Sequence, residues 1–213
     1  MTKAEDEAPQ QDGPKEAAAV EPARKRTPQA PAGAGGGDAS PDAWLARLER
    51  AESLSAAGSH ADAAEAFGTV AAGQPDNLRA VLGLSSALFA LGKYEPAEKE
   101  LRKALKLAAD SPEVNYLLGY TLYKKGVYAA AATQLRRAVE LDPDHGGAYL
   151  ILGEALNQMA ESDAAIQALE MAVQLSPENG KAYYAMGIAY DRKGNHDRAA
   201  EMYRLSREVV ART

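Results

Sequence analysis

Three histidines are the side chains of this sequence best suited to acid–base or metal chemistry. His60 and His196 each follow a glycine by two residues, and His145 follows the acidic turn Asp142-Pro143-Asp144. No two of them have the spacing of paired metal ligands on a helix, and the chain contains no cysteine for a thiolate site, a disulfide or a nucleophile. No glycine-rich phosphate loop or nucleophile elbow occurs either. The sequence therefore predicts no metal, no cofactor and no enzymatic activity, and an aromatic-sized ring packed in a turn accounts for His60 and His196.

Three tyrosines offer a different chemistry, that of molecular contact. Tyr116, Tyr120 and Tyr123 are spaced i, i+4 and i+7, which places them on one face of a helix. Tyrosine is large, stiff and able to form a hydrogen bond at its tip, and it is enriched at binding surfaces. Two interpretations stay open: the three rings face a binding groove, or they pack between neighbouring helices.

The elements that must position these rings recur along the chain. Gly58, Gly92 and Gly126 are 34 residues apart, Gly194 lies two such intervals further on, and Ala160 takes the intervening place. Each interval contains two amphipathic helical runs separated by this turn, since glycine supplies the left-handed conformation that ends a helix. The predicted units are 44–77, 78–111, 112–145, 146–179 and 180–213.

These units resemble tetratricopeptide repeats, which are helix-turn-helix units of the same length. The third unit carries the family's pattern most fully, with Leu118-Gly119, Gly126, Tyr128, Ala131, Leu135, Ala138 and Pro143. The resemblance implies an all-α fold, a right-handed α-solenoid of five repeats over residues 44–213. The first unit departs most from the pattern, as expected of a polar terminal repeat that caps the array.

The resemblance also implies a function, because the family generally binds peptides or helices along a concave groove lined by the first helix of each repeat. We therefore expect a non-enzymatic interaction scaffold or assembly adaptor whose partner is a protein or peptide. One alternative is a structural oligomerisation module that makes contact through its ends or convex face, and a weaker one is RNA binding. The predicted groove residues are Phe89, Tyr116, Tyr120, Tyr123, Lys124, Glu154, Asn157, Tyr184 and Arg192.

The charge balance bears on partners and location. The chain has 24 lysines and arginines against 30 acidic residues, a net charge of −6, whereas a nucleic-acid binder needs a basic surface. No apolar run is long enough to span a membrane. Acidic residues near the start, Glu5, Asp6 and Glu7, argue against a secretory leader, so we expect a cytoplasmic protein.

The two ends of the chain carry further expectations. Residues 1–43 are rich in Ala, Pro and Gly and are predicted to be a disordered tail. The fourth unit contains no lysine or arginine, so one hypothesis is that it receives the basic tail segment Arg24-Lys25-Arg26. At the other end no further helix is expected after the last repeat, so either its last helix caps itself, with its arginines lying over the apolar surface, or the uncapped C-terminal helix pairs with another copy in a homo-oligomer.

Overall fold

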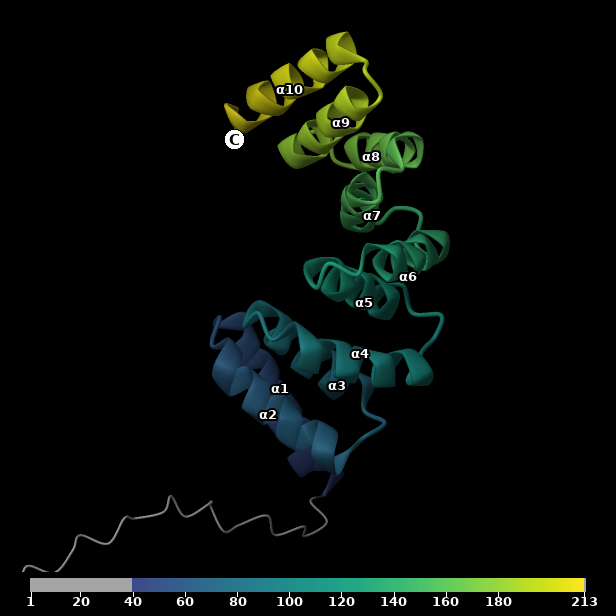
Figure 1. The fold of residues 1–213 in the computed structure, drawn as a ribbon. Helices are drawn as coiled ribbons and strands as arrows, with labels where there is room; N and C mark the ends of the chain where they lie inside the picture. The colour runs from purple at the N-terminus through teal and green to yellow at the C-terminus, as the bar shows by residue number, and fades with distance from the viewer. Residues whose placement is uncertain (1–39, 213) are drawn as a thin grey trace, which may run out of the picture. The chain divides into compact units, whose positions relative to one another are not determined.

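The computed structural model describes residues 40–212, and this part of the chain is helical and contains no strand (Figure 1). The helices alternate between a first and a second helix of each repeat. Their bounds are α1 Pro41–Ala56, α2 His60–Gly73, α3 Leu78–Ala90, α4 Tyr94–Leu107, α5 Pro112–Lys124, α6 Tyr128–Leu141, α7 Gly146–Gln158, α8 Ser162–Leu175, α9 Gly180–Arg192 and α10 His196–Val210.

The first helix of every repeat starts at a side chain that caps it. The capping atom accepts a hydrogen bond of 3.1–3.4 Å from the backbone N–H three residues further on, which satisfies a donor that the helix itself leaves free. Four of these caps fall on the last position of the preceding unit, so the 34-residue period fixes the helix starts as well as the turns. The capping residues are Ser40, Asn77, Ser111, His145 and Asn179.

The first helix begins earlier than the sequence analysis placed the start of the repeats. Ser40 caps α1 and Pro41 occupies its first turn, so residues 41–43 are helical and do not belong to a disordered tail. Serine followed by proline and aspartate is a regular helix start, and this is the physical reason for the correction. Residues 1–39, including Arg24-Lys25-Arg26, lie outside the described residues.

The turn within each repeat has a left-handed residue at the same place. Gly58, Gly92, Gly126 and Gly194 have φ between +71° and +79°. Ala160 occupies this place in the fourth repeat with φ +60°, a conformation that its Cβ makes unfavourable.

Small residues allow the two helices of a repeat to approach closely. A Cβ added at Gly153 would lie 2.4 Å from Leu169 Cγ, and one added at Gly119 would lie 2.6 Å from Leu135 Cγ. The two leucines are fully buried at the centre of the core. The glycine of the leucine-glycine pair is therefore required by packing between the paired helices.

Successive repeats stack so that each second helix contacts the first helix of the next repeat. The first helices also contact one another, α1 with α3, α3 with α5, α5 with α7 and α7 with α9. Within residues 40–212, the second helices make no such contacts among themselves. The array is thus an α-solenoid with the first helices on its inner side, and we call their shared surface the first-helix face.

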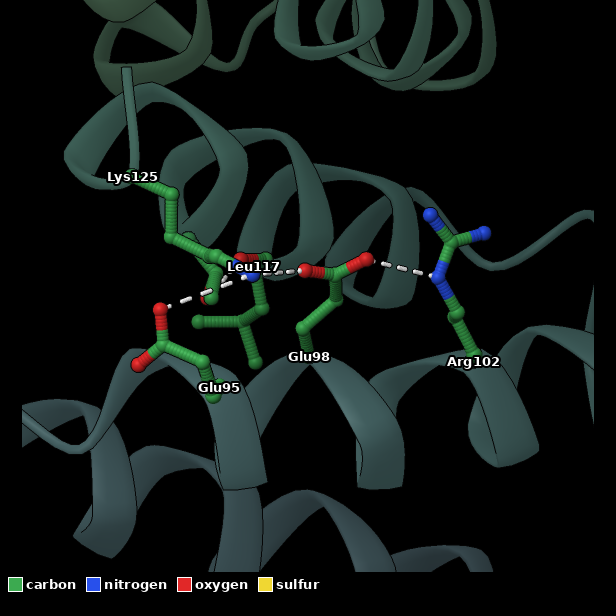
Figure 2. A network of polar contacts seen from close by, with 6 residues as sticks. Glu95, Glu98, Arg102, Leu117 and Lys125 are labelled. Atoms are coloured by element: carbon green, nitrogen blue, oxygen red, sulfur yellow. Dashed lines mark hydrogen bonds and ion pairs between the residues drawn. The ribbon is translucent and has the colours of Figure 1, made fainter. Parts of the chain in front are cut away.

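An ion-pair network joins the second and third repeats. Lys125 at the end of α5 lies 2.6 Å from Glu98 Oε2 and 3.7 Å from Glu95 Oε1, both on α4, and Arg102 lies 2.8 Å from Glu98 on its other side (Figure 2). The Lys125 ammonium, and after it Arg102, lowers the pKa of Glu98 below its ordinary value. Leu117 lies beside these groups (Figure 2).

The same pairing recurs between the fourth and fifth repeats. Lys193 bonds to Asp163, and these two residues hold the repeat positions that Lys125 and Glu95 hold earlier in the chain. At the other two junctions the position of the lysine is taken by Leu91 and Met159. The lysine ion pairs thus help to hold the second repeat on the third and the fourth repeat on the fifth.

Candidate partner-binding face

Four aromatic rings lie together at the centre of the first-helix face. Phe89 of α3 approaches Tyr120 of α5, with ring centroids 4.7 Å apart. Tyr120 lies 6.0 Å from Tyr116 and 6.4 Å from Tyr123 on the same helix. The i, i+4, i+7 spacing produces this arrangement, and we call the four residues the tyrosine cluster.

Rings from neighbouring elements support the cluster from its edges. Tyr94, at the start of α4, packs 5.4 Å from Phe89, and Tyr128, at the start of α6, packs 5.8 Å from Tyr123. His145 approaches Tyr116 to 4.3 Å while its Nδ1 caps α7. The cluster is therefore held on both sides by residues that also define helix ends.

The rings of the cluster combine the two roles that the sequence left open. Tyr116, Tyr120 and Tyr123 pack against the main hydrophobic core. All three and Phe89 are also only half-buried, so part of each ring remains open to solvent. A surface of rigid, partly exposed aromatic rings provides contact area at little entropic cost.

Two charged groups lie beside the cluster. The Lys124 ammonium lies 5.4 Å from the centroid of the Tyr120 ring, within the range of a cation–π interaction. The second is Glu154 of α7. Burial, and after it the negative charge of Glu154, raises the pKa of Tyr123 above the ordinary range of a phenol. The Tyr123 hydroxyl also has this carboxylate as its hydrogen-bond partner.

The structure does not place Asn157 on the open surface, contrary to expectation. Its side chain is 4% exposed, and its Nδ2 donates a 2.8 Å hydrogen bond to the Ala185 carbonyl of α9. The α7–α9 contact covers this position, so Asn157 joins two repeats and does not line the groove. Its residue type gave no sign of this, because an asparagine on a helix face is usually solvated.

Tyr184 and Arg192 are exposed on α9 but form a separate group. Tyr184 is 57% exposed and its ring lies 5.5 Å from Tyr203 of α10. Tyr203 in turn donates a 2.8 Å hydrogen bond to Asp191, and burial together with this bond raises its pKa to about 12. Neither Tyr184 nor Arg192 has a described ring contact with the tyrosine cluster, so the predicted groove residues divide into two groups.

Comparison with known families agrees with this architecture. Family models described as tetratricopeptide repeat match residues 54–119, 116–179 and 158–208. The chain belongs to the tetratricopeptide repeat family. No curated protein matches it in sequence.

Solved structures of other tetratricopeptide repeat proteins share the fold. A crystal structure of MamA is 28% identical, with a TM-score of 0.71, over 78% of this chain and 91% of MamA. A double mutant of MamA is 26% identical, with a TM-score of 0.73, over 79% and 94% of the two chains. YrrB, described as a TPR protein with an unusual peptide-binding site, is 23% identical, with a TM-score of 0.68, over 76% and 84%. At this identity the likeness to YrrB shows the fold alone.

The histidines of this tetratricopeptide repeat protein have different surroundings. The His196 side chain is 77% exposed and lies 3.1 Å from Asp191, so the prediction that its ring packs in the turn is wrong. A carboxylate on the preceding helix draws the ring to the surface. His60 is half-buried, consistent with packing. Across residues 40–212 there is no group of three or more residues that could hold a metal ion, and no helix long and apolar enough to cross a membrane.

Two crevices of this tetratricopeptide repeat array escaped the sequence analysis, and both lie away from the tyrosine cluster. One, of about 410 Å³, is in the first repeat, and the other, of about 260 Å³, is in the fourth. The 34-residue register could have indicated that they are the same crevice in two repeats, because the residues that line the two crevices hold equivalent repeat positions. The first is lined by Arg47, Arg50, Leu54, Asp62, Glu65, Ala66 and Thr69, and the second by Tyr149, Leu152, Leu156, Ala164, Gln167, Ala168 and Met171, with Arg136 of the preceding repeat.

Proposed function

We propose that this protein is a non-enzymatic interaction scaffold that binds a segment of a protein partner on its first-helix face, centred on the tyrosine cluster. The observation that carries the proposal is the packing of Phe89, Tyr116, Tyr120 and Tyr123 into one half-exposed surface across two adjacent repeats. Binding energy at protein interfaces is concentrated in such aromatic residues.

The geometry of the face indicates how a partner would be held. Rings on α3 and α5 form one surface, so a helix or extended segment lying across the two repeats would contact all of them. Lys124 beside the Tyr120 ring and Glu154 beside the Tyr123 hydroxyl add charges of opposite sign to this surface. Apolar contact at the centre and charge at the rim is the usual anatomy of a protein interface.

Two further observations support a scaffold rather than another class of protein. The family generally works through contact surfaces, and in the described residues Lys125 with Glu98 and Lys193 with Asp163 join one repeat to the next. The excess of acidic residues disfavours RNA as the partner. We propose a cytoplasmic location on the sequence grounds given above.

A matched pair of variants tests the proposal. The full chain is used to capture partners, and each captured protein is then purified and its affinity measured by calorimetry. The double variant Tyr120→Ala/Tyr123→Ala should bind at least tenfold more weakly. Truncation of each aromatic anchor lowers the free energy of binding by about 1–2 kcal/mol or more. Tyr149→Ala, a half-buried tyrosine in the crevice of the fourth repeat, serves as the control.

The control separates binding from stability. Both the double variant and Tyr149→Ala remove packing, so melting temperatures are measured for each. Weaker binding by the double variant alone supports the first-helix face. Unchanged affinity for every purified partner would contradict it and would favour the alternative, an oligomerisation module that uses its ends or convex face.

A further inference from the structure

The crevice of the fourth repeat combines an apolar wall with a cation. Leu152, Leu156 and Ala168 in its wall are buried, and Met171 beside them is half-buried. Arg136 of α6 reaches the same crevice from the preceding repeat. Among the described residues that line the crevice, Arg136 is the charged one, so apolar surface and positive charge meet at one place.

The repeat register shows how this apolar wall arises. Met171 holds the position that Lys103 and Arg137 hold in the second and third repeats. There the two basic side chains form ion pairs, Lys103 with Glu100 at 2.7 Å and Arg137 with Asp110 at 2.6 Å. The fourth repeat contains neither lysine nor arginine. Methionine is apolar and flexible, so it adapts its shape to an apolar group that lies against it.

Arg136 lies at the edge of the crevice with room for a second anion. Its Nη2 lies 3.5 Å from Glu161 Oε2, and its side chain is 48% exposed. A guanidinium carries five N–H donors in one plane, and this long contact uses little of that capacity. Carboxylates fit the guanidinium fork through two parallel hydrogen bonds. The geometry therefore favours a carboxylate as the anion.

The volume and the walls of the crevice restrict the ligand further. An apolar cavity of about 150 Å³ is enough for a benzene ring, and this crevice has about 260 Å³. The equivalent crevice of the first repeat is larger, but Asp62 and Glu65 replace Ala164 and Gln167 in its wall. These two carboxylates repel an anion. The fourth repeat is thus the better place for a small apolar anion.

We infer that the crevice of the fourth repeat binds a small carboxylate with an apolar body, the apolar group lying against Met171 and Leu152 and the carboxylate paired with Arg136. A free organic acid and the C-terminal residue of another chain both present this chemistry. The crevice lies away from the tyrosine cluster, so the inference goes beyond the proposed function and does not depend on it.

The test uses the full chain with isotope-labelled methionine methyl groups, observed by NMR. The Met171 signal is assigned with Met171→Leu. One pair of probes is phenylacetate and its uncharged amide, and the other is acetylated glycyl-phenylalanine with a free or an amidated C-terminus. At equal concentration, at least one acid should shift the Met171 signal about threefold more than its amide does. The acid with the larger shift identifies the source, a free acid or a C-terminus.

Variants of two adjacent arginines complete the test. Arg136→Gln should abolish the preference for the acid, and Arg136→Lys, which keeps the charge without the fork, should reduce it. The matched control Arg137→Gln should retain it. The indole signal of Trp44, whose ring lies 4.7 Å from Arg47 of the first crevice, should not move. Melting temperatures show that each variant is folded.

Three results would overturn the inference. They are a Met171 signal that no probe shifts, equal shifts with acid and amide, and a preference that survives both Arg136 variants. An equal shift of the Trp44 signal would show that the acid binds exposed arginines in general, and this too would overturn it. The proposed function is tested at Tyr120 and Tyr123, so the two can fail separately.

Discussion

The first and fourth repeats have the same helical arrangement, but the face that points towards a preceding repeat is apolar in the fourth and charged in the first. In the fourth repeat this face carries Tyr149 and Leu152, and α6 of the third repeat packs against it. In the first repeat the equivalent positions are Arg47 and Arg50, both exposed. The crevice between the two helices is accordingly larger and more charged in the first repeat.

The difference shows that the residue types on this face of a repeat depend on whether a neighbouring repeat covers it. Ala46 and Ser53 of α1 are exposed, and the equivalent residues of the fourth repeat, Ala148 and Ala155, are fully buried. Arg47 covers part of the apolar surface of the first repeat by lying 4.7 Å from the Trp44 ring. The face of the first repeat is therefore suited to solvent, as the sequence analysis expected of a capping unit.

The largest effect should come from exchanging the two faces. Leu152→Arg places a cation in a buried apolar site next to Arg136, and we expect a loss of about 3 kcal/mol or more in the free energy of unfolding. The reciprocal change Arg50→Leu, at the exposed equivalent position, should alter it by less than about 0.5 kcal/mol. Urea denaturation followed by circular dichroism measures both.

These two variants are informative only as a pair. If Leu152→Arg were as mild as Arg50→Leu, the third repeat would not cover the fourth as the structure has it. If Arg50→Leu were strongly destabilising, the first repeat would not be a solvated cap. Either result would remove the contrast between the two faces.

A smaller effect is expected where the helices of one repeat approach each other. Gly153→Ala would bring a Cβ to 2.4 Å from Leu169 Cγ, so the helices must separate, at a cost of about 2 kcal/mol. The first repeat already has Ala51 at this position, packed near Phe67. Ala51→Gly should cost only about 1 kcal/mol, mostly through helix propensity. Thermal unfolding of the two variants compares them, and equal losses would contradict a tighter approach in the fourth repeat.

Much of this contrast could be predicted from the sequence, because it depends on residue type at a fixed period. The helical pairs, the glycine turns and the family followed from the 34-residue spacing of small and apolar residues. Helical periodicity placed Tyr116, Tyr120 and Tyr123 on one face of a helix, and the 34-residue register gave Phe89 the place in the second repeat that Tyr123 has in the third.

Other features depend on distances between repeats, which no local pattern specifies. Asn157 was expected on the groove, but a contact between α7 and α9 buries it. The role of His145 as a helix cap was missed because histidine is an uncommon capping residue, although Asn77, Ser111 and Asn179 at the same repeat position could have indicated it. Which acidic residues form ion pairs between repeats, such as Glu98 and Asp163, likewise follows only from the stacking.

The smallest effect concerns the turn, where the two repeats differ by a single methyl group. Gly58 and Ala160 both have positive φ, and this conformation is sterically unfavourable only for alanine, because of its Cβ. No atom lies within 4 Å of a Cβ built at Gly58, so the backbone alone sets the cost there. We expect Ala160→Gly to stabilise and Gly58→Ala to destabilise the protein by about 0.5–1 kcal/mol each, after the greater freedom of glycine in the unfolded chain is subtracted. Urea midpoints that move in opposite directions would show that the first and fourth repeats share one turn geometry. Midpoints that both fall would mean that Ala160 makes contacts in the fourth repeat that glycine cannot replace.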